Sequence, residues 1–116
     1  MIFLVLAYGS ENDWNQLSHE EQKSLLTQDE VLRNRGSLVA AVTPTVTTVR
    51  AWDGIPATTT QPFAPLSAPL AWFGVIEARD LAHAVQLVAK TPCARAQGAV
   101  ELRRMIQLNH GAPVVA

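Results

Sequence analysis

The sequence predicts an α+β domain in the order β-α-β-β-α-β, and three observations support this prediction. Residues 2–8 and 70–77 are apolar at both alternating sets of positions, which is typical of strands covered on both faces. A helical segment follows each of them, and further strands follow the helices. This order is that of the ferredoxin-like split β-α-β fold. The two doubly apolar segments are its first and third main strands, which are the central ones.

The first helix is predicted from a capping box at its start. Ser18 and Glu21 have the S-x-x-E spacing in which the two side chains satisfy free backbone N–H groups reciprocally. We expect a helix over residues 19–35 that ends before a glycine, as helices commonly do. Leu25 and Leu32 are expected on its inner side.

The second helix is predicted from Asp80, whose side chain is a good N-cap. Pro92 is expected to close it, because proline cannot continue a helix. Apolar residues at the i, i+3, i+4, i+7 spacing are expected to form its inner face: Leu81, Ala84, Val85 and Val88.

The remaining strands are shorter. Asp53-Gly54 is a hairpin turn dipeptide, and the Val- and Thr-rich residues 46–52 are expected to pair with 58–60 across it. Residues 99–106 alternate apolar and charged side chains, which favours an edge or half-exposed strand. We also expect a short strand at 37–42, a polar loop at 9–13 and a proline-punctuated loop at 61–69.

The predicted topology leaves one apolar surface uncovered. Two right-handed crossovers carry both helices to the same face of the antiparallel sheet. The other face of the central strands is still apolar, and soluble monomers rarely expose large contiguous apolar patches. We therefore expect a homodimer, a two-fold assembly resembling a dimeric α/β barrel. Residues 1–106 are expected to form the single domain, and 107–116 a C-terminal tail.

Composition limits the classes of function. The 116 residues are 48% apolar and 16% charged, with a net charge of −1, and the nine basic residues are scattered. This balance is typical of a globular protein and does not favour nucleic-acid binding. The apolar run at 1–7 is too short for a membrane span, and we expect no membrane association. The single Cys93 cannot form a disulfide within the chain, so we expect a reducing, cytoplasmic location.

Several motifs resemble those of one known family. They are the strand end Tyr8-Gly9-Ser10-Glu11, the strand and turn at 46–54, the strand and helix start at 73–81, and the final strand at 98–103. Together they resemble the YCII-related or DGPF-domain family across residues 1–105. The resemblance implies a ferredoxin-like α+β fold and a dimer.

The chain departs from the family at its signature. Asp-Gly-Pro-Phe is here Thr60-Gln61-Pro62-Phe63, and the charged residues that usually follow are replaced by the uncharged residues 64–68. The family's Gly-Gly pair is Ala71-Trp72. The region that the resemblance marks as the active site therefore lacks its usual charges.

Arg50 is the strongest polar candidate for a ligand contact. It lies in a segment otherwise made of Val, Thr and Trp, and its planar guanidinium suits a carboxylate or another anion. The alternative, which we favour, is a surface ion pair with Glu77 or Glu101. Asp53 is interpreted as a turn residue.

Aromatic residues are the second group of candidates. Trp14, Trp52, Trp72 and Phe73 are expected either to line a ligand pocket or to pack in the core or an interface, and packing is the commoner role. Tyr8 and Glu77 end the two central strands and are expected to meet near one mouth of such a pocket. The tentative ligand-binding set is Tyr8, Arg50, Trp52, Pro62, Phe63, Trp72, Phe73 and Glu77.

No motif predicts a particular reaction, so the catalytic residues are unknown. The sequence has no nucleotide-binding or nucleophile motif, and its three histidines lack metal-ligand spacing. No cofactor or metal is expected. We therefore expect a DGPF-type homodimer, non-catalytic or weakly catalytic, that binds a small ligand or a regulatory partner near residues 60–74. The alternatives are a small lyase or isomerase acting on a small organic acid, with Arg50 as anion holder, and a monooxygenase-like barrel.

Overall fold

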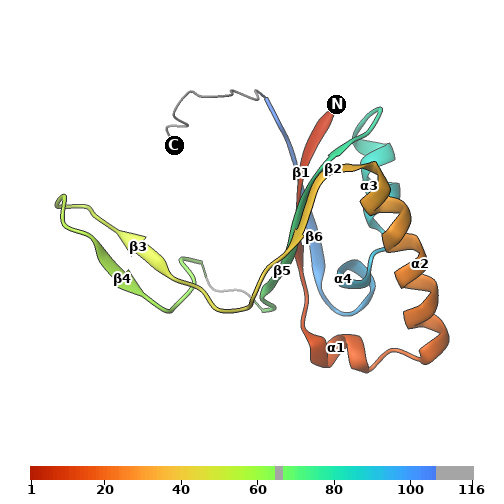
Figure 1. Cartoon of the computed structure of the whole chain (residues 1–116), viewed down its shortest axis with the longest axis horizontal. Helices are drawn as coiled ribbons and strands as arrows, with labels where there is room; N and C mark the ends of the chain where they lie inside the picture. Colours follow the sequence, from red (N-terminus) through yellow and green to blue (C-terminus); the bar gives the residue numbers. More distant parts are fainter. Residues whose placement is uncertain (65–66, 107–116) are drawn as a thin grey trace.

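The computed structural model describes residues 1–64 and 67–106, apart from the side chains at 28–29, 31–33 and 35–38. Four strands form an antiparallel sheet in the order β2-β5-β1-β6, and two more form a separate hairpin (Figure 1). The elements are β1 (Ile2–Tyr8), α1 (Glu11–Asn15), α2 (His19–Arg35), β2 (Gly36–Ala41), β3 (Thr48–Arg50), β4 (Ala57–Thr59), β5 (Leu70–Glu77), α3 (Leu81–Val88), α4 (Pro92–Arg95) and β6 (Ala99–Arg104).

The sheet confirms the predicted α+β class. β1 and β5 are the central strands and pair antiparallel from Ile2 opposite Glu77 to Tyr8 opposite Leu70. β2 lies outside β5, and β6 lies outside β1. The four main strands therefore have the neighbours that the ferredoxin-like order requires.

The hydrophobic core lies on one face of this sheet. Phe3, Val5 and Ala7 of β1 are buried beside Trp72 and Ile76 of β5. All the helices lie on this side (Figure 1), and Ala84 and Val88 of α3 join the same core. The alternation of strand side chains explains why every second residue of β1 is buried.

The opposite face of the sheet carries no helix in Figure 1. Leu4 and Leu6 of β1 pair with Val75 and Phe73 of β5 there, and these side chains are half-buried. Tyr8 extends the row along β1. We call the surface formed by Leu4, Leu6, Tyr8, Phe73 and Val75 the open face.

The N-terminal polar segment is helical where a loop was expected. Ser10 caps α1, and its Oγ accepts a hydrogen bond from the backbone N–H of Asp13 at 3.1 Å. The same hydroxyl donates to a carboxylate oxygen of Asp13 at 2.9 Å. Ser10 and the acidic Asp13 three residues later therefore form a capping pair that starts one short helix.

The long helix agrees with the prediction at both ends. α2 covers His19–Arg35, and the backbone N–H of Glu21 donates to Ser18 Oγ at 3.2 Å. Leu25 is buried as expected. The prediction for Leu32 concerns one of the side chains that the structure does not describe. The glycine that was expected to stop the helix is also the first residue of β2.

The third helix is capped as predicted, but its inner face is narrower. The carboxylate of Asp80 accepts a hydrogen bond from the backbone N–H of His83 at 2.8 Å. Leu81 and Val85 were expected inside, yet they are 57% and 49% exposed. A short helix of this length presents only one row, Ala84 and Val88, to the sheet.

Pro92 does not close α3 as expected. The helix ends at Val88, whose carbonyl accepts a hydrogen bond from the buried Thr91 hydroxyl at 2.6 Å. Pro92 instead begins the short helix α4, with Thr91 as N-cap. Proline suits this first helical position because its missing N–H group would have no partner there.

The β3–β4 hairpin projects from the sheet as an arm, which we define as residues 43–64. Its strands are shorter than predicted, and its turn uses Gly54 at a positive φ of 86°. In Figure 1 the arm extends from the side of the sheet opposite the helices. The radius of gyration is 16.1 Å, whereas a compact chain of this length has about 13 Å. The arm is thus not packed onto the chain's own domain.

Candidate functional site

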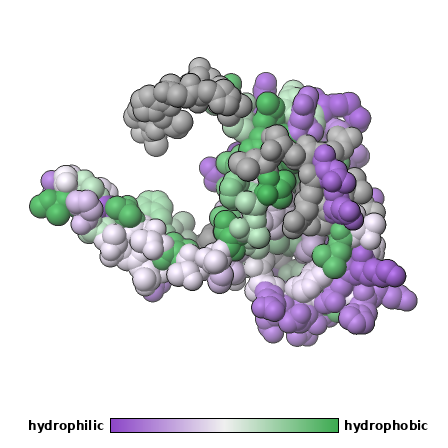
Figure 2. All heavy atoms as spheres, in the orientation of Figure 1, coloured by the Kyte–Doolittle hydropathy of each residue, from purple (hydrophilic) through white to green (hydrophobic). Residues whose placement is uncertain are grey.

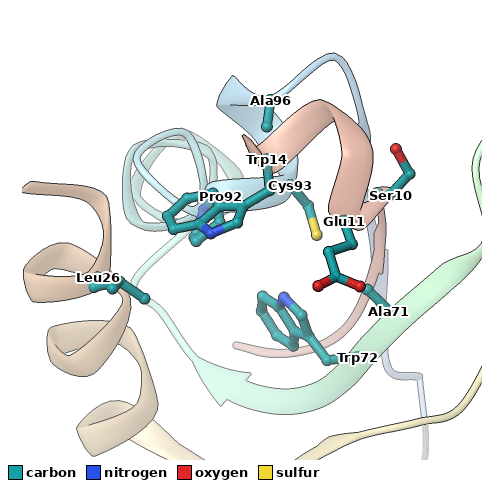
Figure 3. A pocket seen from close by; sticks show the side chains of 10 residues that line it. Ser10, Glu11, Trp14, Leu26, Ala71, Trp72, Pro92, Cys93 and Ala96 are labelled. Carbon is teal, nitrogen blue, oxygen red and sulfur yellow. The ribbon is translucent and has the colours of Figure 1, made fainter. Parts of the chain in front are cut away.

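A pocket of about 380 Å³ lies on the helical side of the sheet. α1 and α4 form its upper wall and β5 its floor, and α2 contributes Leu26 at one side (Figure 3). Two indole rings, Trp14 from α1 and Trp72 from β5, face the same space from opposite walls. The pocket is predominantly apolar in its lining.

Local hydrogen bonds hold the upper wall in place. The Gly9 N–H donates to the Pro69 carbonyl at 3.0 Å, which fixes the chain where β1 ends. Ser10 then caps α1, and the side-chain amide of Gln22 donates to the Trp14 carbonyl at 2.9 Å. α1 is therefore tied to both β1 and α2, which positions the Trp14 ring.

The polar groups of the pocket come from its rim. Figure 3 shows the Glu11 carboxylate turned toward the space between the two indoles, and the Cys93 sulfur beside it. Glu11 is exposed, whereas Cys93 is buried. A planar ring could stack between Trp14 and Trp72 while a hydroxyl group on it donates to Glu11.

Close packing at Gly9 completes the pocket wall. A Cβ atom placed there would lie 3.0 Å from the Cys93 sulfur, which is closer than side chains normally approach. Glycine therefore allows α4 to lie directly against the end of β1. This close approach brings Cys93 to the pocket.

Only one of the eight predicted ligand-binding residues, Trp72, lines this pocket. Its neighbour Phe73 lies on the open face, because successive strand residues point to opposite faces. Trp14, which was expected to join Trp72, also lines it. Glu11 and Cys93 were not predicted as pocket residues, although the caps Ser10 and Thr91 could have revealed the short helices that carry them.

Tyr8 and Glu77 do not meet, which corrects the prediction. β1 and β5 are antiparallel, so their C-terminal ends lie at opposite ends of the sheet. Tyr8 is opposite Leu70, and Glu77 is opposite Ile2. The Tyr8 hydroxyl instead interacts with the Glu101 side chain on the neighbouring β6, and this interaction, together with burial, raises the pKa of Tyr8.

The other predicted residues lie on the arm. The Arg50 guanidinium lies 5.6 Å from the Trp52 ring and 5.4 Å from the Phe63 ring. Pro62 lines a separate hollow of about 480 Å³ at the base of the arm. Glu101, one of the ion-pair partners expected for Arg50, has its carboxylate 3.6 Å from Arg103. The predicted set is therefore divided between the pocket, the open face, the arm and the C-terminal end of β5, where Glu77 lies.

The described residues contain neither a candidate metal-binding group nor a candidate membrane-spanning helix. Within residues 1–64 and 67–106, no group of three or more His, Cys, Asp or Glu side chains could hold a metal ion. No helix in the same part of the chain has both the length and the apolar character needed to cross a membrane.

Comparisons with known proteins agree with this fold. The family model of the YCII-related domain matches residues 1–109. Among solved structures, the chain is similar to 5-chloro-2-hydroxyhydroquinone dehydrochlorinase from Burkholderia phenoliruptrix AC1100, in complex with 2,5-dihydroxybenzoquinone. The sequence identity is 17%, the TM-score is 0.51, and the match covers 96% of each chain. No curated protein matches. Because the family model covers nearly the whole sequence, this chain belongs to the YCII-related family.

Proposed function

We propose that this chain binds a small planar aromatic molecule in the pocket between Trp14 and Trp72. The observation that carries the proposal is the pair of facing indoles in an apolar cavity of about 380 Å³. Ligand pockets commonly have about 300–1,000 Å³ and combine apolar walls with a few polar groups. Glu11 supplies such a group, and it favours a ring that bears hydroxyl donors.

The structural neighbour supports this choice of ligand class. This neighbour was solved in complex with 2,5-dihydroxybenzoquinone, a small planar ring that carries oxygen substituents. Such a ring is small enough for this pocket. We further propose a cytoplasmic, DGPF-type binding protein without strong catalysis.

A catalytic function is the second candidate. The neighbour is a dehydrochlorinase, and Glu11 is a carboxylate at the rim of the pocket of this chain. A lyase or isomerase would use such a group to accept a proton from the ring. The anion-holding role considered for Arg50 has less support, because Arg50 lies on the arm. Recovery of the ligand after incubation separates the two candidates: a binding protein returns it unchanged, and an enzyme converts it.

We also propose that the open face is covered by a second copy. Leu4, Leu6, Phe73 and Val75 form a contiguous apolar row on this face. Pairing two identical faces about a two-fold axis would bury both rows at once. The resulting homodimer is the assembly that the sequence predicts.

The pocket proposal predicts a specific loss of binding. Trp14→Ala should weaken binding of 2,5-dihydroxybenzoquinone about 10- to 100-fold, because one of the two stacking surfaces is removed. Isothermal titration calorimetry measures the dissociation constant. Trp52→Ala is the matched control, because it also removes an indole ring but Trp52 lies on the arm and does not line the pocket. Equal affinities for wild type and Trp14→Ala, with circular dichroism showing both folded, would place the ligand elsewhere.

A further inference from the structure

The arm exposes apolar side chains that ordinary surfaces do not carry. Trp52 and Phe63 are 89% and 75% exposed, and Val49 and Ile55 are exposed with them. Figure 2 shows hydrophobic residues at intervals along the arm. Charged residues are scarce in the same segment, since Arg50 and Asp53 are the only two between positions 43 and 64. Depletion of charge with enrichment of aromatic residues is the composition of interface centres.

Arg50 gives the arm a second interface feature. Its guanidinium lies within cation–π distance of both Trp52 and Phe63. Its Nε is buried and has no hydrogen-bond partner within the described residues. Trp and Arg are the residue types that most often dominate binding energy when a partner covers them. We call Arg50, Trp52 and Phe63 the arm cluster.

The arm is a small hairpin with few stabilising contacts of its own. It consists of two strands of three residues each, and an isolated two-stranded hairpin is at best marginally stable in water. Internal bonds help at its base, where the Thr48 hydroxyl donates to the Gln61 carbonyl at 2.6 Å. They do not remove the aromatic rings from solvent. The arm therefore has the form of a segment that is completed by another molecule.

The placement of the arm favours a second copy of this chain as its partner. The arm projects from the side of the sheet that carries the open face (Figure 1). The hollow of about 480 Å³ at its base is lined by Val42, Val46, Pro62 and Leu70, so apolar surface continues from β5 into the arm. A second copy seated on the open face would lie beside the arm of the first, and the two-fold axis would place the second arm beside the first copy.

We propose that the arm lies across a second copy of this chain, so that each copy's arm cluster packs against the open-face side of the other. This inference rests on the proposed homodimer and adds the element that holds it together. Each buried aromatic residue removes about 150–250 Å² from water. Trp52 and Phe63 would thus supply roughly half of the ~800 Å² that a stable interface buries on each partner.

The first test removes the aromatic rings of the arm cluster. Trp52→Ser with Phe63→Ser should raise the dimer dissociation constant about 100-fold or more, because two interface anchors are lost. Analytical ultracentrifugation measures the constant. Leu81→Ser with Val85→Ser is the matched control, since both residues are exposed on α3, on the helical side. The control pair should leave the constant within about threefold of wild type.

The outcomes of this test are distinguishable. A wild-type dimer that is unaffected by the arm variant would overturn the arm proposal and leave the open-face dimer standing. A wild-type chain that stays monomeric at tens of micromolar would overturn both. The Trp14–Trp72 pocket lies within one chain, so ligand binding is judged separately from either result.

The second test locates the arm directly. A photoreactive p-benzoylphenylalanine in place of Trp52 should form crosslinks to peptides of β1, β5 or β6. An equimolar mixture of ¹⁴N- and ¹⁵N-labelled chains should show by mass spectrometry that the joined peptides come from different copies. The same photoreactive residue in place of Leu81 should give no such product. Crosslinks from position 52 that stay within one copy, or that reach only the helices, would overturn the proposal.

Discussion

Gly98→Ala is expected to destabilise the protein by about 3 kcal/mol, the upper end of the loss usually seen when a tightly packed site is overfilled. A Cβ atom at this position would lie 2.0 Å from the Tyr8 carbonyl oxygen and 2.7 Å from the Cys93 carbonyl oxygen. Both are backbone atoms, so β6 would have to move away from β1 or from α4. Chemical denaturation followed by circular dichroism measures the change.

A neighbouring substitution controls for this effect. Ala99→Ser changes an exposed residue at the start of β6 and should alter the free energy of unfolding by less than about 0.5 kcal/mol. If Gly98→Ala and Ala99→Ser unfolded at the same denaturant concentration as wild type, β6 would not lie as close to Tyr8 as the structure places it.

Leu6→Asp is expected to prevent formation of the proposed dimer and to leave a folded monomer. Leu6 lies near the middle of the open face, opposite Phe73. In a two-fold dimer the change would bury two carboxylates in an apolar interface, which should weaken association by more than about 1,000-fold. In a single chain the half-buried site stays in reach of water. Sedimentation equilibrium should therefore give the mass of one chain for the variant and of two for wild type.

The matched control is Leu81→Asp. Leu81 is an exposed leucine on the helical side of the sheet, where an acidic residue at the start of α3 is also favourable. This variant should remain dimeric. Dissociation by both variants alike, or by neither, would contradict the placement of the interface on the open face.

The main strands and the helices α2 and α3 could be predicted because their signals are local. β1 and β5 are apolar at consecutive positions, and only central strands of a sheet tolerate that pattern. Ser18 and Asp80 mark helix starts through hydrogen bonds that span only three residues. Such contacts do not depend on how distant parts of the chain are arranged.

The site could not be predicted to the same degree because it depends on distant contacts. Trp14 and Trp72 are far apart in sequence, and they face each other only because α1 and α4 pack against the end of β1. The prediction that Tyr8 and Glu77 meet is wrong because antiparallel neighbours have their C-terminal ends at opposite ends of the sheet. A turn dipeptide such as Asp53-Gly54 likewise predicts a hairpin but not the direction in which the hairpin projects.

Because the arm projects away from the sheet, residues that are close in the sequence lie far apart in the structure. Arg50, Phe63 and Trp72 fall within a short stretch that resembles the signature region of the family. In the folded chain Arg50 and Phe63 lie on the arm, whereas Trp72 lies in strand β5 of the sheet. The arm cluster and the pocket are therefore two surfaces with separate proposed partners.

Fluorine NMR can test directly whether a ligand binds between Trp14 and Trp72. The chain has three tryptophans, and the third, Trp52, lies on the arm and serves as an internal control. We would label the protein with 5-fluorotryptophan, assign the three ¹⁹F resonances by single substitutions, and titrate with 2,5-dihydroxybenzoquinone. The proposal predicts saturable shifts of the Trp14 and Trp72 resonances while that of Trp52 stays in place. A shift confined to Trp52, or no shift at Trp14 and Trp72 at saturating ligand, would contradict it.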